Sequence, residues 1–181
     1  LTAPEVEHRG ILDYDCPMQW IDTPLEGAHE EFVGESFGRV NRQEAKLCVQ
    51  TLRDYYMKIG RARALDEQID VGVISPYRAQ VQYLRQLVRS DEWLRPLRRL
   101  ITINTVDGFQ GQERDIIIIS LVRANDDGQI GFLADLRRMN VAITRARMKL
   151  IIIGNADTLA RHKFYKELHQ YVMGLAEQPE I

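Results

Sequence analysis

With 181 residues and a mass of 21.0 kDa, the chain has room for one domain of ordinary size. Apolar residues make up 45% and charged residues 28%, which are globular proportions and exclude a disordered, collagen-like or coiled-coil protein. The net charge is only −2, but residues 78–149 carry 13 Lys and Arg against 8 Asp and Glu, and 12 of those 13 are arginines. This block indicates either a solvated basic face or a polyanionic partner, since arginine binds phosphate in a bidentate manner.

Several classes of protein are excluded at this point. The longest apolar run, at residues 116–122, is broken by Ser120 and is far shorter than the ~20 residues of a membrane span. The first twenty residues carry four acidic side chains, unlike a signal peptide. Cys16 and Cys48 are too few and too far apart for a zinc site or a disulfide framework. We expect no metal site, no membrane partner and a cytoplasmic protein.

Residues 1–40 are the least regular part of the chain. Met18–Asp22 has the composition of a short strand, and one proline and three glycines between residues 24 and 38 predict a loop after it. The chain starts at Leu1 rather than at a methionine, so we interpret it as an excised or processed piece. We take residues 1–40 as an irregular lead-in from a preceding domain.

From residue 41 onward, predicted strands alternate with predicted helices. Asn41 and Glu44 have the spacing of a capping box, and apolar residues at helical spacing, Cys48 among them, continue to Gly60. Further strands are predicted at 70–75, 101–103, 115–122 and 149–153, and further helices after Pro76 and at 135–146 and 164–172. The alternation predicts an α/β fold with a doubly wound, mainly parallel sheet and helices on both faces, formed by residues 41–181.

Ligands bind at the carboxyl ends of the strands in such a sheet. Three polar segments lie just after a predicted strand or just before the next one. They read Ser-Pro-Tyr-Arg-Ala-Gln at 75–80, Thr-Ile-Asn-Thr-Val-Asp-Gly-Phe-Gln-Gly-Gln-Glu-Arg-Asp at 102–115, and Arg-Arg-Met-Asn-Val-Ala-Ile-Thr-Arg-Ala-Arg at 137–147.

Taken together, these segments resemble motifs IV, V and VI of the superfamily 1 helicases, in the order and at the spacing of that family. The branch that they resemble is subclass B, which contains the up-frameshift RNA helicase, senataxin and related DNA helicases, and we expect a bacterial-type DNA helicase. The resemblance covers residues 41–154. It implies that residues 41–181 are the second RecA-like domain of a two-domain motor driven by ATP.

The resemblance implies roles for individual residues. Arg78 and Arg145 match two family arginines that reach the γ-phosphate of ATP, where a guanidinium stabilises the charge of phosphoryl transfer. Glu113 matches the carboxylate that accepts hydrogen bonds from the ribose. Gln110 and Gly111 match the turn that links the phosphate site to the nucleic-acid site. Outside these motifs, the two arginines would be read as solvated helix residues and Glu113 as an ordinary loop residue.

Five further residues have two interpretations each. Ser75 and Thr105 are candidates for contacts with nucleic-acid phosphates, because hydroxyls donate to phosphate oxygens, and capping of a helix or turn is the alternative. Tyr77 and Phe109 are candidates for base stacking, although packing in the core or between domains is the better interpretation. Arg147 either reaches the nucleotide or holds its motif in place through a salt bridge.

Two parts of an ATP-hydrolysing motor are missing from the sequence. It contains no Gly-x-x-x-x-Gly-Lys-Ser/Thr loop, and no predicted strand ends in Asp-Glu. The family carries both in the first RecA-like domain, which we expect upstream of Leu1 in the same polypeptide. We therefore predict an ATP-dependent helicase that uses ATP with Mg²⁺ bound mainly by that domain. The isolated chain is predicted to be inactive, and the partner is single-stranded nucleic acid, DNA rather than RNA.

Two other functions stay open. The chain is alternatively a RecA-like module that binds nucleic acid or a partner without driving hydrolysis, or the motor half of a helicase–nuclease fusion. A pure binding module has no need of the complete ATP-facing set formed by Arg78, Glu113 and Arg145, and this favours the motor. No residue in the sequence tests the fusion.

Overall fold

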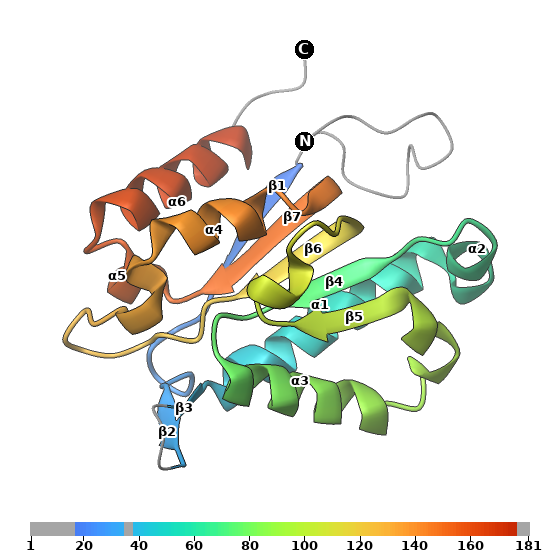
Figure 1. The fold of residues 1–181 in the computed structure, drawn as a ribbon, viewed down its shortest axis with the longest axis horizontal. Coiled ribbons are helices and arrows are strands. Elements are labelled where there is room, and N and C mark those ends of the chain that lie inside the picture. Colours follow the sequence, from blue (N-terminus) through green and yellow to red (C-terminus); the bar gives the residue numbers. More distant parts are fainter. Residues whose placement is uncertain (1–16, 35–37, 177–181) are drawn as a thin grey trace.

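The structure is a computed structural model, and it describes residues 17–34 and 38–176 (Figure 1). The strands are β1 (Met18–Asp22), β2 (Glu31–Val33), β3 (Gly38–Val40), β4 (Val71–Ile74), β5 (Ile101–Asn104), β6 (Arg114–Ser120) and β7 (Ala146–Gly154). The α-helices are α1 (Arg42–Ile59), α2 (Arg61–Asp66), α3 (Arg78–Ser90), α4 (Leu136–Ile143), α5 (Ala156–Leu159) and α6 (Lys163–Ala176). Short 3₁₀ helices occupy Arg95–Leu100, Asp107–Phe109 and Gly131–Ala134.

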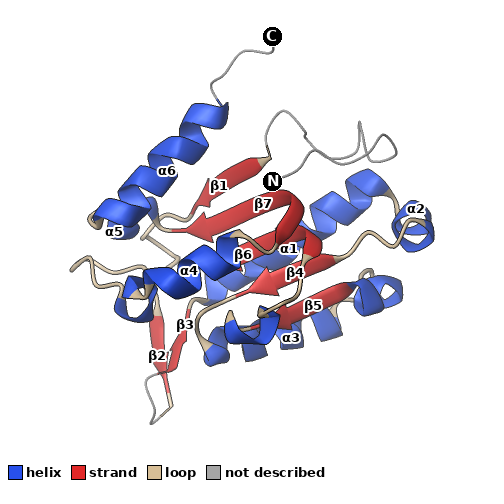
Figure 2. Cartoon of the chain, turned by 45° about the horizontal axis from the view of Figure 1, so that its top comes forward, coloured by secondary structure: helices blue, strands red, loops and turns tan. Residues whose placement is uncertain are grey.

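Five strands form one parallel sheet in the order β1-β7-β6-β4-β5. Helices cover both faces of this sheet, with α1 and α3 on one side and α4 and α6 on the other (Figure 2). The predicted α/β fold with a parallel sheet and helices on both faces is confirmed. Strands β2 and β3 pair with each other as a separate antiparallel hairpin.

The aliphatic side chains of β6 alternate between the two faces of the sheet. Ile116 and Ile118 point into the core under α1 and α3, whereas Ile117 and Ile119 point into the core under α4 and α6. Successive side chains of a strand point to opposite faces, so a strand covered on both sides needs apolar residues at every position. The uninterrupted aliphatic run of β6 is therefore typical of a central strand that is covered on both faces.

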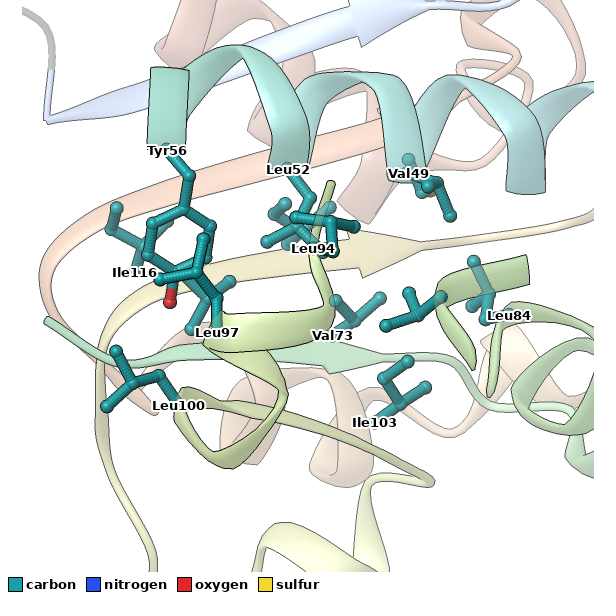
Figure 3. Close-up of a cluster of buried hydrophobic side chains, with 14 of the residues drawn as sticks. Val49, Leu52, Tyr56, Val73, Leu84, Leu94, Leu97, Leu100, Ile103 and Ile116 are labelled. Carbon is teal, nitrogen blue, oxygen red and sulfur yellow. The ribbon is translucent and has the colours of Figure 1, made fainter. Parts of the chain in front are cut away.

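One of the two hydrophobic cores lies between the sheet and helices α1 and α3 (Figure 3). Its buried members include Leu52 and Tyr56 on α1, Val73 on β4 and Leu84 on α3. Burying a side chain of this size contributes about 1.5–3 kcal/mol. The Tyr56 hydroxyl stays satisfied in this apolar setting because it donates to the carbonyl oxygen of Ile69 at 2.9 Å. The core thus fixes α1 and α3 against the strands that carry the polar segments.

The start of α1 is only partly as predicted. Asn41 caps the helix, since its side-chain oxygen accepts from the Glu44 N–H at 3.1 Å, and Gly60 ends it with a positive φ of 88°. The Glu44 carboxylate does not return to Asn41, whose own N–H donates to Gln80 at 3.0 Å. Glu44 instead contacts the end of β6 across the core.

The described part of residues 1–40 is more regular than expected. The predicted strand at Met18–Asp22 is confirmed as β1, and it pairs with β7 at the edge of the main sheet. The expected loop after it contains the β2–β3 hairpin. None of the helices in the described residues is both long enough and apolar enough to cross a membrane.

Candidate functional site at the two edges of the sheet

The parallel strands give the sheet two different edges. We call the edge where the strands begin the amino edge and the edge where they end the carboxyl edge. Figure 1 shows the start of α3 and the β2–β3 hairpin at the carboxyl edge, and the start of β7 at the amino edge. The seven residues of β6 separate these edges by about 20 Å at ~3.3 Å per residue.

Arg145 contacts the loop that carries Glu113 at the amino edge. Arg145 ends the turn between α4 and β7, and its guanidinium donates to the Gln112 carbonyl at 3.4 Å, next to Glu113. The Arg145 carbonyl in turn accepts from the Arg114 N–H at 3.0 Å. Glu113 is exposed, as is Gly111, which has a positive φ of 75°. Gln110 is exposed in the same loop.

The Arg145 side chain is held partly against its own helix. Its Nε donates to the Val141 carbonyl at 3.1 Å, and a terminal nitrogen donates to the Thr144 hydroxyl at 3.1 Å. Arg145 remains partly exposed. The guanidinium is therefore oriented at the surface beside the Gln112–Glu113 backbone, without an acidic partner of its own among the described residues.

An ion-pair cluster lies under this loop and fixes it. Arg147 contacts Asp70 at 2.9 Å and Asp115 at 3.0 Å, so one guanidinium joins the starts of β4, β6 and β7. Burial raises the pKa of Asp70, and the nearby Asp115 carboxylate adds to the rise, while Arg147 opposes it. The salt-bridge interpretation of Arg147 is confirmed. Arg147 lies two residues after Arg145, and its ion pairs position the end of the third polar segment.

Arg78, Ser75 and Thr105 lie at the opposite, carboxyl edge. Arg78 is the first residue of α3, is exposed, and has no ion-pair or hydrogen-bond partner within residues 17–34 and 38–176. The structure therefore brings Arg145 to the loop of Glu113 but does not bring Arg78 to that loop. The reason is strand direction: the segment of Arg78 follows β4, whereas Glu113 and Arg145 precede β6 and β7.

The two hydroxyls at the carboxyl edge have different surroundings. Ser75 is fully buried, and its Oγ accepts from the Tyr77 N–H at 3.5 Å, as the capping interpretation expects. It does not reach the surface where a phosphate would bind. Thr105 is partly exposed and lines a surface pocket with Pro76, Asp107 and Phe132. Thr105 is therefore the better placed of the two for an external ligand.

The aromatic residues of the motifs are packing residues, but a neighbouring aromatic is exposed. Tyr77 is 3% exposed, and Phe109 is fully buried against Gly72, where a Cβ would come within 2.8 Å of its ring. Phe132 is 54% exposed at the carboxyl edge and stacks on Tyr77, with 5.4 Å between ring centroids. The sequence predicts no role for Phe132, although Gly131-Phe132 directly precedes the third polar segment and is the signal that could have indicated one.

A strained turn leads the chain out of β6. Val122 has a φ of +70°, which is costly for a β-branched residue, and the Arg123 N–H donates across it to Leu121 at 2.7 Å in a γ-turn. Such a conformation costs about 1–3 kcal/mol and persists where its surroundings fix it. Two side chains fix the turn here. The Glu44 carboxylate accepts from the Val122 N–H at 2.7 Å, and the Asn41 side chain donates to the Val122 carbonyl at 3.1 Å.

Glu44 is a fully buried carboxyl group that this turn requires. It also accepts from the Ser120 hydroxyl at 2.7 Å, and Ser120 in turn accepts from Gln80 at 3.1 Å. Burial raises the pKa of Glu44 to about 7, despite the hydrogen bonds from Ser120 and Val122, which lower it. The helix-spacing signal could not reveal this role, because the partners are 76 and 78 residues away.

The turn places Arg123 where it forms a buried ion pair with Glu30. The Arg123 Nε lies 2.6 Å from a Glu30 oxygen, with 7% and 8% of the two side chains exposed. Glu30 also accepts from the Ala124 N–H at 3.0 Å and from the Asn125 side chain at 3.2 Å. Burial lowers the pKa of Arg123, but the hydrogen bonds to Glu30 and Tyr77 more than offset this, so the pKa is raised. The pair anchors the segment that enters β2 to the carboxyl edge.

Comparison with known proteins places this arrangement in a family. A family model described as an AAA domain matches residues 3–157. The chain is 35% identical over 166 residues to the DNA polymerase alpha-associated DNA helicase A of Saccharomyces cerevisiae, covering 88% of the chain and 22% of that protein. It is 38% identical over 170 residues to an uncharacterized ATP-dependent helicase of Methanocaldococcus jannaschii, covering 94% and 22%. It is 35% identical over 161 residues to a regulator of nonsense transcripts 1 homolog of Neurospora crassa, covering 86% and 14%.

These relatives are much longer than the chain. The chain spans less than a quarter of the length of each of the three. The matched residues of the family model include all three polar segments, at both edges of the sheet. The chain belongs to the AAA-domain family that forms the C-terminal half of superfamily 1 ATP-dependent helicases of the up-frameshift and senataxin type.

Proposed function

We propose that the chain is the C-terminal motor domain of an ATP-dependent helicase and supplies half of an ATP site shared with an N-terminal RecA-like domain of the same polypeptide. The observation that carries the proposal is the pairing of Arg145 with the Glu113 loop at the amino edge. A phosphate-binding loop follows the carboxyl end of a strand, so the partner domain would present its carboxyl edge to this amino edge.

In that arrangement, Arg145 contributes positive charge to the nucleotide. Phosphoryl transfer spreads charge over the equatorial oxygens of the γ-phosphate, and a preorganised guanidinium stabilises that charge. Glu113 has the chemistry to accept hydrogen bonds from the two ribose hydroxyls. Arg147 acts indirectly, by holding the loop and the end of α4 on the ion pairs to Asp70 and Asp115.

We assign Arg78 to the bound strand rather than to ATP. It is an exposed guanidinium at the carboxyl edge, two residues after Pro76 of the Thr105 pocket and about 20 Å of strand away from Arg145. Phosphate contacts of this kind position a single strand without reading its sequence. Gln110 and Gly111, in the loop that crosses from one edge to the other, are the residues suited to couple the strand to the nucleotide.

Mg²⁺ would be held by the N-terminal domain. Within residues 17–34 and 38–176, no three His, Cys, Asp or Glu side chains are grouped to bind a metal ion, and no step is assigned to such an ion on these residues. The ion accompanies ATP in phosphoryl transfer, where it neutralises charge on the phosphates.

The experiment that tests the motor function is steady-state ATP hydrolysis by the full-length protein with and without a single strand. We expect hydrolysis to rise at least tenfold on addition of a single-stranded oligonucleotide, with DNA stimulating more than RNA. Stimulation by RNA alone would overturn the DNA preference and leave the motor intact. Strand binding with no ATP turnover would contradict the motor and favour the binding module.

A further inference from the structure

A pocket at the carboxyl edge lies between the β2–β3 hairpin and the turn that carries Phe132. Its volume is about 160 Å³, and three rings, two guanidinium groups and one glycine line it: Phe32, Tyr77, Phe132, Arg39, Arg123 and Gly131. None of the motif residues assigned above to the nucleotide takes part. The two sides of the pocket are about a hundred residues apart in the sequence.

The exposed walls of the pocket are aromatic. Phe32 on β2 is 55% exposed and Phe132 is 54% exposed, whereas Tyr77 behind Phe132 is buried. The Phe132 and Tyr77 rings stack with an interplanar angle of 29°, so Phe132 is supported from behind by a fixed ring. Leaving a phenyl ring exposed to water costs about 25 cal/mol of free energy per Å² of apolar surface. Two exposed rings around one pocket therefore indicate a ligand.

One guanidinium holds both sides of the pocket. Arg123 pairs with Glu30 at the base of the hairpin and donates to the Tyr77 hydroxyl at 3.3 Å. Tyr77 donates in turn to the Ile130 carbonyl at 3.5 Å, next to the turn that carries Phe132. Gly131 makes this turn with a φ of +51°, and a Cβ there would collide with the Arg123 guanidinium. The rings are therefore preorganised by buried polar contacts.

The charge of the pocket favours a polyanion. Arg123 is neutralised by Glu30, which leaves Arg39 as the cation without an acidic partner among the described residues that line the pocket. Arg39 lies 4.8 Å from the centre of the Phe32 ring and has no acidic partner within the described ranges. A cation beside exposed rings suits a nucleotide, whose phosphate and base meet the two kinds of group at once.

The location connects this pocket to the rest of the carboxyl edge. Phe132 also lines the neighbouring pocket that contains Thr105, so its ring stands between the two. A strand that contacts Thr105 would therefore run past Phe132. Base stacking on an aromatic ring needs no particular base, because every base has a π face.

We propose that this pocket receives one nucleobase of the bound single strand, which stacks on Phe132 opposite Phe32 while Arg39 contacts the adjoining phosphate. The proposal rests on the proposed function and names the residues that would bind an unpaired base of the strand. Glu30 and Arg123 are positioning residues that act through Tyr77 and the hairpin.

The test measures binding of a fluorescent oligothymidine to the full-length protein by anisotropy, without nucleotide. Stacking on one aromatic side chain is worth about 1–3 kcal/mol, so Phe132→Ala is expected to weaken binding about tenfold, and Phe32→Ala to weaken it as well. Phe132→Trp keeps a stacking surface and should retain wild-type affinity. An oligonucleotide that carries abasic sites should bind wild type and Phe132→Ala equally.

A second readout reports stacking directly. Oligonucleotides with 2-aminopurine lose fluorescence when the base stacks, so wild type should quench this signal and Phe132→Ala should not. The matched control is Tyr171→Ala, which removes an aromatic that is 60% exposed on α6 and should change neither readout. Unchanged affinity and quenching in Phe132→Ala, with normal strand-stimulated ATP hydrolysis, would overturn the base site, leave the motor intact and favour a peptide as the occupant of the pocket.

Discussion

Replacing Arg145 with alanine in the full-length protein is expected to lower kcat for ATP hydrolysis about 10³-fold. A guanidinium that stabilises the γ-phosphate in the transition state contributes ~10³–10⁵ in rate in related phosphoryl-transfer systems. Arg145→Lys should recover little of the rate, because an ammonium group lacks the planar fork of the guanidinium. The measurement is strand-stimulated turnover at saturating ATP, together with oligonucleotide affinity in the absence of nucleotide, which should stay within twofold of wild type.

Two other arginines make the comparison specific. Arg137 is exposed on α4, the helix that leads to Arg145, so Arg137→Ala should leave kcat unchanged. Arg78→Ala should weaken strand binding and leave kcat at saturating strand within a few-fold, since Arg78 lies at the opposite edge. A loss of kcat in Arg78→Ala equal to that in Arg145→Ala would contradict the division of the two edges.

Replacing Glu30 with alanine is expected to lower the free energy of unfolding of the chain by about 3–5 kcal/mol. Removing one partner of a buried ion pair leaves the other charge buried and unpaired, and this is among the costliest single changes in a protein. The loss is large beside the total of about 5–15 kcal/mol for a typical domain. Urea unfolding of the purified chain, followed by circular dichroism, measures it.

Glu31 provides the matched control in the next position. Its ion pair with Arg42 at 3.2 Å is half-exposed on both sides, with 47% and 52% of the side chains accessible. Exposed pairs contribute about 0–1 kcal/mol, so Glu31→Ala should barely move the unfolding midpoint. Equal effects of the two substitutions would show that the Glu30–Arg123 pair does not anchor the hairpin to the sheet.

The main sheet was predictable because local signals and tertiary structure agree in it. The aliphatic run at Ile116–Ile119 requires cover on both faces, and Asn41 and Gly60 bound α1 as helix signals should. The β2–β3 hairpin was not predictable. Its strands have three residues each, too short for a periodic pattern, and its anchor is the contact of Glu30 with Arg123, 93 residues away.

The candidate site was predictable in composition but not in layout. The resemblance grouped Arg78 with Arg145, yet a segment that follows a strand and a segment that precedes one face opposite edges of a parallel sheet. Ser75 looked accessible in a polar segment, but it directly continues a buried strand and is buried with it. Glu44 had the spacing of a capping residue, and only the packing of α1 on β6 takes its side chain to Ser120 and Val122.

The measurement that tests the account most directly is ATP hydrolysis by the purified 181-residue chain, beside the full-length protein at the same concentration. If Arg145 and Glu113 form one half of a shared ATP site, as proposed, the isolated chain should hydrolyse ATP no faster than the buffer background, whereas the full-length protein should turn over ATP. Hydrolysis by the isolated chain that Arg145→Ala abolishes would contradict a shared site.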